Sequence, residues 1–170
     1  MKYSDEQLTK HFGAPKGFSR VSNTLTRLYT LLDGFDASTI GLYAYLRSWR
    51  NTSDPNMKGI VWHSREYMYL QSGLGRTAFA SRLNKLIEVG LVEIIKSPTI
   101  PNKDYFIVYD PLDRDTFIEK FGDKVDKFFN DVDELEDRLE TDRLRRKRIE
   151  YEKLQQEIEK RFPVDEEITS

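Results

Sequence analysis

The sequence predicts a mainly α-helical protein with a small β-hairpin, and three observations carry this prediction. Apolar residues recur every three or four positions in several segments that end at Gly or Pro, as on one face of a helix. Two runs rich in β-branched and aromatic residues, 91–96 and 104–109, stand seven residues apart, as in a hairpin. From 132 to 162 neither Gly nor Pro occurs and charges dominate, which indicates a long exposed helix.

Composition narrows the class of protein before any motif is considered. The 170 residues are enough for one domain with a core and an appendage. The chain has no Cys and only two His, so we expect no disulfide, no metal site and no cofactor. It shows neither a signal-peptide pattern nor an apolar run of about 20 residues. We therefore expect a soluble cytoplasmic protein without a membrane partner.

Charge is divided unevenly along the chain, whose net charge is −2. Residues 37–110 contain nine Lys/Arg and six Asp/Glu, a net of +3. Residues 111–170 contain 13 Lys/Arg and 19 Asp/Glu, a net of −6. A mildly basic segment within an acidic chain is compatible with nucleic-acid binding but is weak evidence by itself.

The first part of the chain predicts an arm, two helices and a short strand. Residues 1–17 are polar and carry Gly and Pro near their end, which indicates a flexible arm with room for a short helix at 5–11. Residues 18–32 and 36–50 show helical periodicity, and residues 59–62 read as a strand. The apolar positions of the two helices are Val21, Leu25, Leu28, Leu31 and Leu32, then Leu42, Tyr45, Leu46 and Trp49.

Two short helices joined by a tight turn are predicted between residues 64 and 90. Ser64 can cap the first helix, and Gly73-Leu74-Gly75 forms the turn. The second helix begins at Arg76 and ends near Gly90. The inward side chains would be Tyr67, Leu70 and Leu74, then Phe79, Leu83, Leu86 and Ile87. Followed by the hairpin, whose loop 97–103 would be the wing, this order is that of a winged helix-turn-helix.

The outward face of the second helix carries the candidate contacts to double-stranded DNA. Arg and Lys can bond guanine edges or phosphates, and small side chains let the backbone approach the groove. The wing loop contains two Pro and can lie along the DNA backbone or in the minor groove. The candidates are Arg76, Thr77, Ala78, Ser81, Arg82, Lys85, Asn102 and Lys103. The alternative is a solvated helix face and an ordinary hairpin loop.

Other patterns carry less weight. Residues 73–78 match the dinucleotide pattern GxGxxG/A, but that fingerprint requires a preceding strand, and here a helix precedes. Five of the six residues 143–148 are basic, which could mark a second DNA-contacting surface or a site for an acidic partner. The pairs Asp142–Arg146 and Glu134–Arg138 favour an ordinary charged helix instead. No catalytic constellation occurs, so we do not expect an enzyme.

The last third of the chain predicts a helical extension over residues 113–162 and a frayed tail at 163–170. Asp113 can cap a helix, although Gly122 weakens its continuity. Its apolar face would be Phe117, Phe121, Val125 and Phe128. A heptad-like pattern begins at Val132, Leu135 and Leu139, is interrupted at Asp142 and Arg146, and shifts register toward Leu154, Ile158 and Phe162. This helix therefore has potential for coiled-coil pairing without a clear heptad seam.

Several motifs occur together within residues 18–112. They are F-x-x-V-x-N-x-L at 18–25, GLYAYL at 41–46, RTA at 76–78, LIEVGLV at 86–92, PNK at 101–103 and DP at 110–111. In this order the segment resembles the N-terminal winged-helix domain of RepA-type plasmid replication initiators, which is related to the N-terminal domain of the primosomal protein DnaD. The resemblance implies a homodimer that binds repeated origin DNA and helps to load replication machinery. By position, it implies DNA contacts at Arg76, Thr77, Arg82, Lys85 and Lys103.

The chain departs from this family after Pro111, where one charged helix stands in place of a separate C-terminal helical domain. We therefore expect a homodimeric, sequence-specific DNA-binding protein in plasmid or phage replication initiation, with a replication protein as a further partner. One alternative is a transcriptional repressor that dimerises through its C-terminal helix. Another is an adaptor whose winged helix binds protein.

Overall fold

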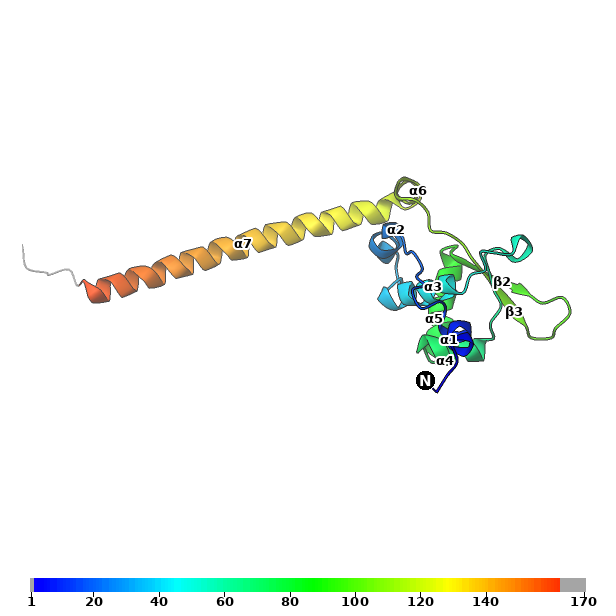
Figure 1. Cartoon of the computed structure of the whole chain (residues 1–170). Helices are drawn as coiled ribbons and strands as arrows, with labels where there is room; N and C mark the ends of the chain where they lie inside the picture. Colours follow the sequence, from blue (N-terminus) through cyan, green and yellow to red (C-terminus); the bar gives the residue numbers. More distant parts are fainter. Residues whose placement is uncertain (1, 163–170) are drawn as a thin grey trace, which may run out of the picture. The chain divides into compact units, whose positions relative to one another are not determined.

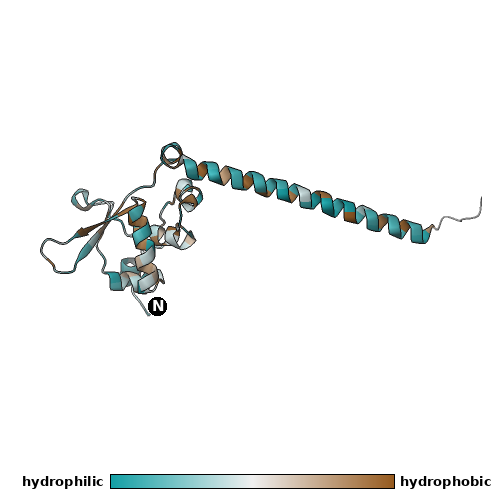
Figure 2. Ribbon diagram, turned by 180° about the vertical axis from the view of Figure 1, so that it is seen from behind, coloured by the Kyte–Doolittle hydropathy of each residue, from teal (hydrophilic) through white to brown (hydrophobic). Residues whose placement is uncertain are grey.

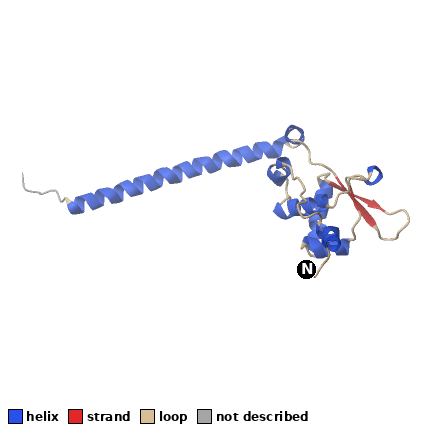
Figure 3. Cartoon of the chain, viewed as in Figure 1, coloured by secondary structure: helices blue, strands red, loops and turns tan. Residues whose placement is uncertain are grey.

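The computed structural model describes residues 2–162 and is mainly helical with one small antiparallel sheet (Figures 1 and 3), as the sequence predicts. The chain divides into two compact units, Met1–Gly122 and Asp123–Ser170. The expected frayed tail at 163–170 lies outside the described residues. Within the described part of the chain, no helix is long and apolar enough to cross a membrane.

The N-terminal unit holds all the strands and all but one of the helices found within residues 2–162. In chain order its elements are α1 (Asp5–Phe12), α2 (Asn23–Arg27), η1 (Tyr29–Leu31), α3 (Ala37–Ser48), η2 (Pro55–Met57), β1 (Ile60–Val61), α4 (Arg65–Ser72), α5 (Arg76–Glu88), β2 (Val92–Lys96), β3 (Asp104–Val108) and α6 (Arg114–Lys120). Helix α7 (Gly122–Arg161) follows α6 and makes up the described part of the second unit apart from its final residue.

The sheet is built from the predicted hairpin and the predicted short strand. Its strand order is β1-β3-β2, and both pairings are antiparallel. Val92 lies opposite Val108 at one end of the hairpin, and Lys96 lies opposite Asp104 at the other. The loop 97–103 extends beyond the paired ends of β2 and β3 (Figure 3). The strand prediction is confirmed, and the loop has the place of a wing.

The core of this unit forms where α3 and α5 pack against each other and against the sheet. Apolar residues spaced three or four apart turn the same face of each helix inward. The fully buried side chains there include Leu42, Tyr43, Leu46, Phe79, Leu83, Leu86 and Phe106. Each fully buried side chain of this size contributes about 1.5–3 kcal/mol relative to exposure. The tightly packed core holds α5 in a fixed orientation.

Three predicted helix faces differ from the structure. In α4, Met68 is buried while Leu70 is 84% exposed, so the expectation that Leu70 points inward is wrong. The rings of Tyr67 and Tyr69 pack on His63 and Phe79, which turns Met68 inward and leaves Leu70, about 200° away around the helix, facing out.

Ser22, one of two residues expected to cap the helix within 18–32, caps α2 at the backbone N–H of Leu25. The helix is shorter than expected because α2 ends at Arg27 and the 3-10 helix η1 follows it. Val21 lies outside this helix and is exposed. Near the end of α5, Ile87 is also more exposed than its spacing suggested. Further along the chain, the weak point expected at Gly122 is a break, since α6 ends before it and α7 begins there.

Candidate nucleic-acid interface

The turn between α4 and α5 is made by two glycines with different roles. Ser64 caps α4 by accepting a hydrogen bond from the backbone N–H of Tyr67. Gly73 ends that helix with φ 74°, a left-handed conformation that glycine adopts without a steric penalty. Gly75 is the N-cap of α5 and provides no side-chain cap. Because α4 stands where a strand would be required, the turn lacks the context of a dinucleotide-binding loop.

Helix α5 turns one face to the core and presents the opposite face to solvent. Phe79, Leu83 and Leu86 are buried, as predicted. Arg76, Thr77 and Ser81 are exposed, whereas Ala78 is half-buried. The guanidinium of Arg76 lies 5.9 Å from the centre of the Tyr69 ring. The outward face therefore begins at Arg76 and includes two small hydroxyl side chains.

One exposed polar residue on this face was missed from the sequence. Asn84 lies three residues after Ser81 and seven after Thr77, so helical spacing alone places it in their row. Its amide can donate and accept at once, which is the arrangement that reads adenine in the major groove. Between Arg76 and Lys85 the sequence contains no acidic residue.

Arg82 and Lys85 do not project freely from α5, contrary to expectation. The Arg82 Nε donates to Ser38 Oγ at 2.8 Å, and its guanidinium lies 3.7 Å from the Asp36 carboxylate. The Lys85 side chain is only 18% exposed, and its Nζ lies 2.9 Å from the Glu88 carboxylate. The partners of Arg82 lie outside α5 and are not apparent from that helix, whereas Glu88, the partner of Lys85, lies three residues later on the same helix. Ser38 is 44 residues from Arg82 in sequence.

Asp36 caps α3 and also forms an ion pair with Arg82 of α5, so it links the two helices. Its carboxylate accepts hydrogen bonds from the hydroxyl of Ser38 and from the backbone N–H and hydroxyl of Thr39, and so caps α3. The hydrogen bond from Ser38, followed by those from Thr39, lowers the pKa of Asp36 to about 2. The carboxylate is therefore charged at neutral pH and attracts Arg82.

The wing loop presents Asn102 but holds Lys103 back. Asn102 is exposed at φ 59°, a left-handed conformation at the tip of the loop. The Lys103 Nζ donates to the backbone carbonyl of Trp62, at the end of β1, and lies 5.4 Å from the Tyr105 ring. The ammonium of Lys103 is thus directed at the sheet.

At the base of the wing, Asp104 forms ion pairs with two basic side chains, Lys96 and Arg65. The Lys96 Nζ lies 2.6 Å from one carboxylate oxygen, and the Arg65 guanidinium lies 3.0 Å from the other. The hydrogen bond from Lys96 is the main cause that lowers the pKa of Asp104. The Lys96 side chain remains 76% exposed, so its charge still faces solvent.

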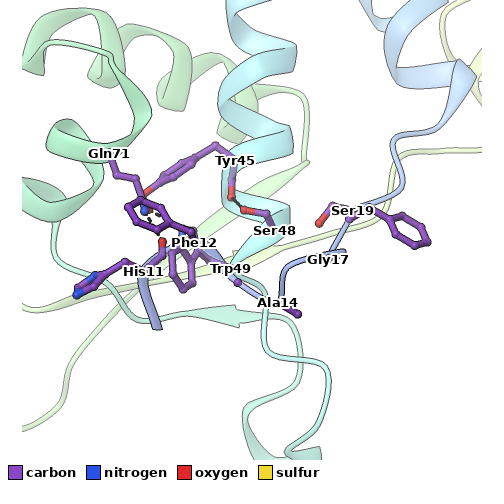
Figure 4. Close-up of a pocket in the computed structure, with 11 residues that line it drawn as sticks. His11, Phe12, Ala14, Gly17, Ser19, Tyr45, Ser48, Trp49 and Gln71 are labelled. Carbon is purple, nitrogen blue, oxygen red and sulfur yellow. Dashed lines mark hydrogen bonds between the residues drawn. The ribbon is translucent and has the colours of Figure 1, made fainter. Parts of the chain in front are cut away.

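A separate hollow of about 490 Å³ lies between the N-terminal segment, α3 and α4 (Figure 4). Gln71 of α4 forms hydrogen bonds with residues on the other two sides of the hollow. The Gln71 Oε1 accepts hydrogen bonds from the Tyr45 hydroxyl and the Trp49 indole, both at 3.0 Å, and its Nε2 donates to the backbone carbonyl of His11 at 2.6 Å. Because Gln71 bonds residues from both α3 and the end of α1, we interpret this hollow as the attachment point of α1. The segment 1–17, expected to be a flexible arm, thus contains a helix bonded to α4.

Neither histidine belongs to a group that could hold a metal ion in the described chain. The His63 ring packs between Trp49 and Tyr67, with ring centres 4.2 Å and 5.0 Å away. Burial is the main cause that lowers its pKa, which favours a neutral ring. Within residues 2–162, no group of three His, Asp or Glu side chains is placed to hold a metal ion.

No known protein family, no curated protein and no solved structure was found to be similar to this chain. The functional argument therefore depends on the geometry of the N-terminal unit.

Proposed function

We propose that the N-terminal unit is a winged helix-turn-helix that binds double-stranded DNA, with α5 as its reading helix. The observation that carries the proposal is the polar face of α5 from Arg76 to Lys85, which contains no acidic residue. Arg76, Thr77, Ser81 and Asn84 lie in solvent on a helix that follows a tight turn and precedes the β2–β3 hairpin with its projecting loop. This order of elements is that of proteins whose second helix enters the major groove.

The side chains divide between reading and positioning. Arg76 can bond a guanine edge or a phosphate, and Asn84 can pair with adenine through its amide. Thr77 and Ser81 leave room for the backbone to approach the groove. The backbone N–H groups at the start of α5 have no side-chain cap and suit a phosphate. Arg82, Lys85 and Lys103 would add positive charge near the DNA while keeping their contacts within the protein.

On the biological role, we propose plasmid or phage replication initiation by a homodimer on repeated sites. The motif order in residues 18–112 supports this, and a net charge of +3 on residues 37–110 suits binding in pairs better than binding by one copy. The single helix α7 that follows is also compatible with a repressor. Directly repeated binding sites within an origin favour the initiator, and a site over a promoter favours the repressor.

DNA binding is tested by fluorescence anisotropy with a random duplex and with the duplex upstream of the protein's own gene. We expect Arg76→Ala to weaken binding to both and to reduce the salt dependence by about one unit. Asn84→Ala should mainly reduce the preference for the specific duplex. Arg27→Ala, which removes the same charge from the exposed end of α2, is the matched control. Folded protein that binds neither duplex at low salt would exclude this proposal and leave the protein-binding adaptor.

A further inference from the structure

Six apolar residues along one stripe of α7 stand at intervals that read the same in both directions, whereas Phe128, Leu135 and Ile149, which are also exposed, lie outside this stripe. The six residues are Phe129, Val132, Leu139, Leu144, Tyr151 and Leu154, and the intervals between them are 3, 7, 5, 7 and 3 residues. The midpoint of the series falls between Thr141 and Asp142. Except for half-buried Val132, each of these side chains is 57–61% exposed. Figure 2 shows apolar residues recurring along this otherwise hydrophilic helix.

These six side chains lie on one stripe of the helix. At about 100° per residue they fall within an arc of about 140°. Four charged residues run along the middle of the same stripe, within about 60°: Glu136, Glu140, Arg143 and Lys147. All four are exposed. The stripe is therefore amphipathic, with apolar side chains at its ends and edges and charges at its centre.

The charges are also arranged symmetrically about the midpoint, with opposite signs. Glu140 and Arg143 are each second from it, and Glu136 and Lys147 are each sixth. Within one helix, Glu136 and Glu140 are like charges at i,i+4, as are Arg143 and Lys147, and such pairs destabilise an isolated helix. Within the helix, opposite charges are available at i,i+3 from Glu140 to Arg143 and from Lys147 to Glu150, so a second helix would add to these pairs.

We propose that α7 pairs with α7 of a second copy in antiparallel orientation about this midpoint. A two-fold axis there brings residues at equal distances from the midpoint to the same height, because closed dimers are self-complementary. Glu136 then faces Lys147 of the second copy, and Glu140 faces Arg143. Phe129 faces Leu154 farther out. This inference deepens the proposed dimer and does not depend on whether the N-terminal unit binds DNA.

The charges disfavour a parallel pair of helices in register. Parallel helices would place Glu136 against Glu136 and Arg143 against Arg143, and like charges at such positions weaken pairing. In the antiparallel pair, the like-charged Asp133 and Glu150 also reach the same height. They lie on opposite edges of the stripe, about 100° apart, and so do not meet.

Charge exchange in the full chain tests the partner and its orientation, with association measured by sedimentation equilibrium. We expect the unmodified chain to dimerise. E136K/E140R should raise the dissociation constant by about tenfold or more, since like charges would then face each other. The variant with all four charges exchanged, E136K/E140R/R143E/K147E, should restore the dimer. Helicity by circular dichroism controls for the fold of α7. A monomeric unmodified chain, or an E136K/E140R variant that still dimerises, would overturn the proposal.

Disulfide cross-linking then tests the register. Because the natural sequence contains no Cys, an introduced Cys can pair only with another introduced Cys. E136C/K147C should form a covalent dimer on oxidation. E136C or K147C alone should not, because the two copies of either residue lie roughly 16 Å apart along the antiparallel pair, too far for a disulfide. Efficient covalent dimerisation of each single variant would indicate parallel helices and contradict the inference.

Discussion

The Nε of Arg82 donates to Oγ of Ser38 across 2.8 Å and ties the middle of α5 to the first turn of α3. Ser38 in turn donates to Asp36 at 2.7 Å, so the arginine joins the capping network of a neighbouring helix. A basic residue on the expected reading helix thus acts in part as a structural contact. This separates Arg82 from Arg76, although both stand on the same helix.

Replacing these two arginines should separate stability from binding. We expect Arg82→Ala to lower the free energy of unfolding by about 1 kcal/mol, because Ser38 loses a hydrogen-bond donor and Asp36 loses an ion-pair partner. Arg76→Ala should change it by less than about 0.5 kcal/mol, since the side chain is exposed. Urea unfolding followed by circular dichroism measures both. Equal stability of the two variants would show that the Arg82 contact contributes nothing.

The cap at Asp36 should make stability depend on pH in the acid range. The folded-state pKa, about 2, is below the ordinary value of 3.8, so the stabilisation is present above pH 3.8 and is lost as pH falls through about 2. Asp36→Ala should cost about 1 kcal/mol at neutral pH through loss of the N-cap. The difference in free energy of unfolding between Asp36→Ala and the natural chain should shrink as pH falls from 3.8 to about 2.

Asp36→Asn is the control for this titration, because it keeps a capping oxygen without an ionisable group. Urea midpoints measured from neutral to acid pH for the three proteins provide the comparison. An Asp36→Ala deficit that stays constant with pH would contradict the role assigned to the carboxylate.

Gln71 should determine the attachment of α1. Gln71→Leu leaves the Tyr45 hydroxyl and Trp49 indole without their acceptor, at a cost of roughly 1–3 kcal/mol for each donor that stays buried. It also removes the bond to the carbonyl of His11, so hydrogen exchange in α1 should accelerate. Unchanged exchange in α1 would mean that other contacts hold this helix.

Burial raises the pKa of Tyr45 to about 12. Neutral Tyr45 therefore contributes its full stabilisation of the fold below the ordinary pKa of 10. This stabilisation is lost as pH rises through about 12, where the folded-state hydroxyl ionises. Tyr45→Phe removes the titration, so its stability should fall less steeply than that of the natural chain above pH 10. Urea midpoints on the alkaline side measure the difference, and parallel curves would count against this origin of the alkaline loss.

Short-range signals were enough to predict the order of elements. Ser64 and Asp113 cap α4 and α6 as expected, because a capping side chain bonds backbone groups only three residues away. Strand composition and turn residues similarly located the hairpin. In these cases the determining contacts lie within a few residues, so one segment of sequence contains the necessary information.

Long-range contacts explain what could not be predicted. Periodicity placed Arg82 and Lys103 outside the core but could not show that they are engaged by Ser38 and the Trp62 carbonyl, more than 40 residues away. The exposure of Leu70 is similarly decided by ring packing against other elements. Asn84 is different, because its helical spacing from Thr77 and Ser81 is a short-range signal that places it on the same face.

The left-handed turn at Asn102 allows the wing to be tested without disturbing its fold. At φ 59°, Asn102→Ala should cost roughly 1–2 kcal/mol, whereas Asn102→Gly should leave the free energy of unfolding nearly unchanged, since glycine adopts this conformation freely. Asn102→Gly therefore removes only the amide. If the wing contacts DNA, this variant should bind more weakly in anisotropy while unfolding at the same urea concentration. Unchanged affinity would restrict the proposed interface to the face of α5 between Arg76 and Asn84.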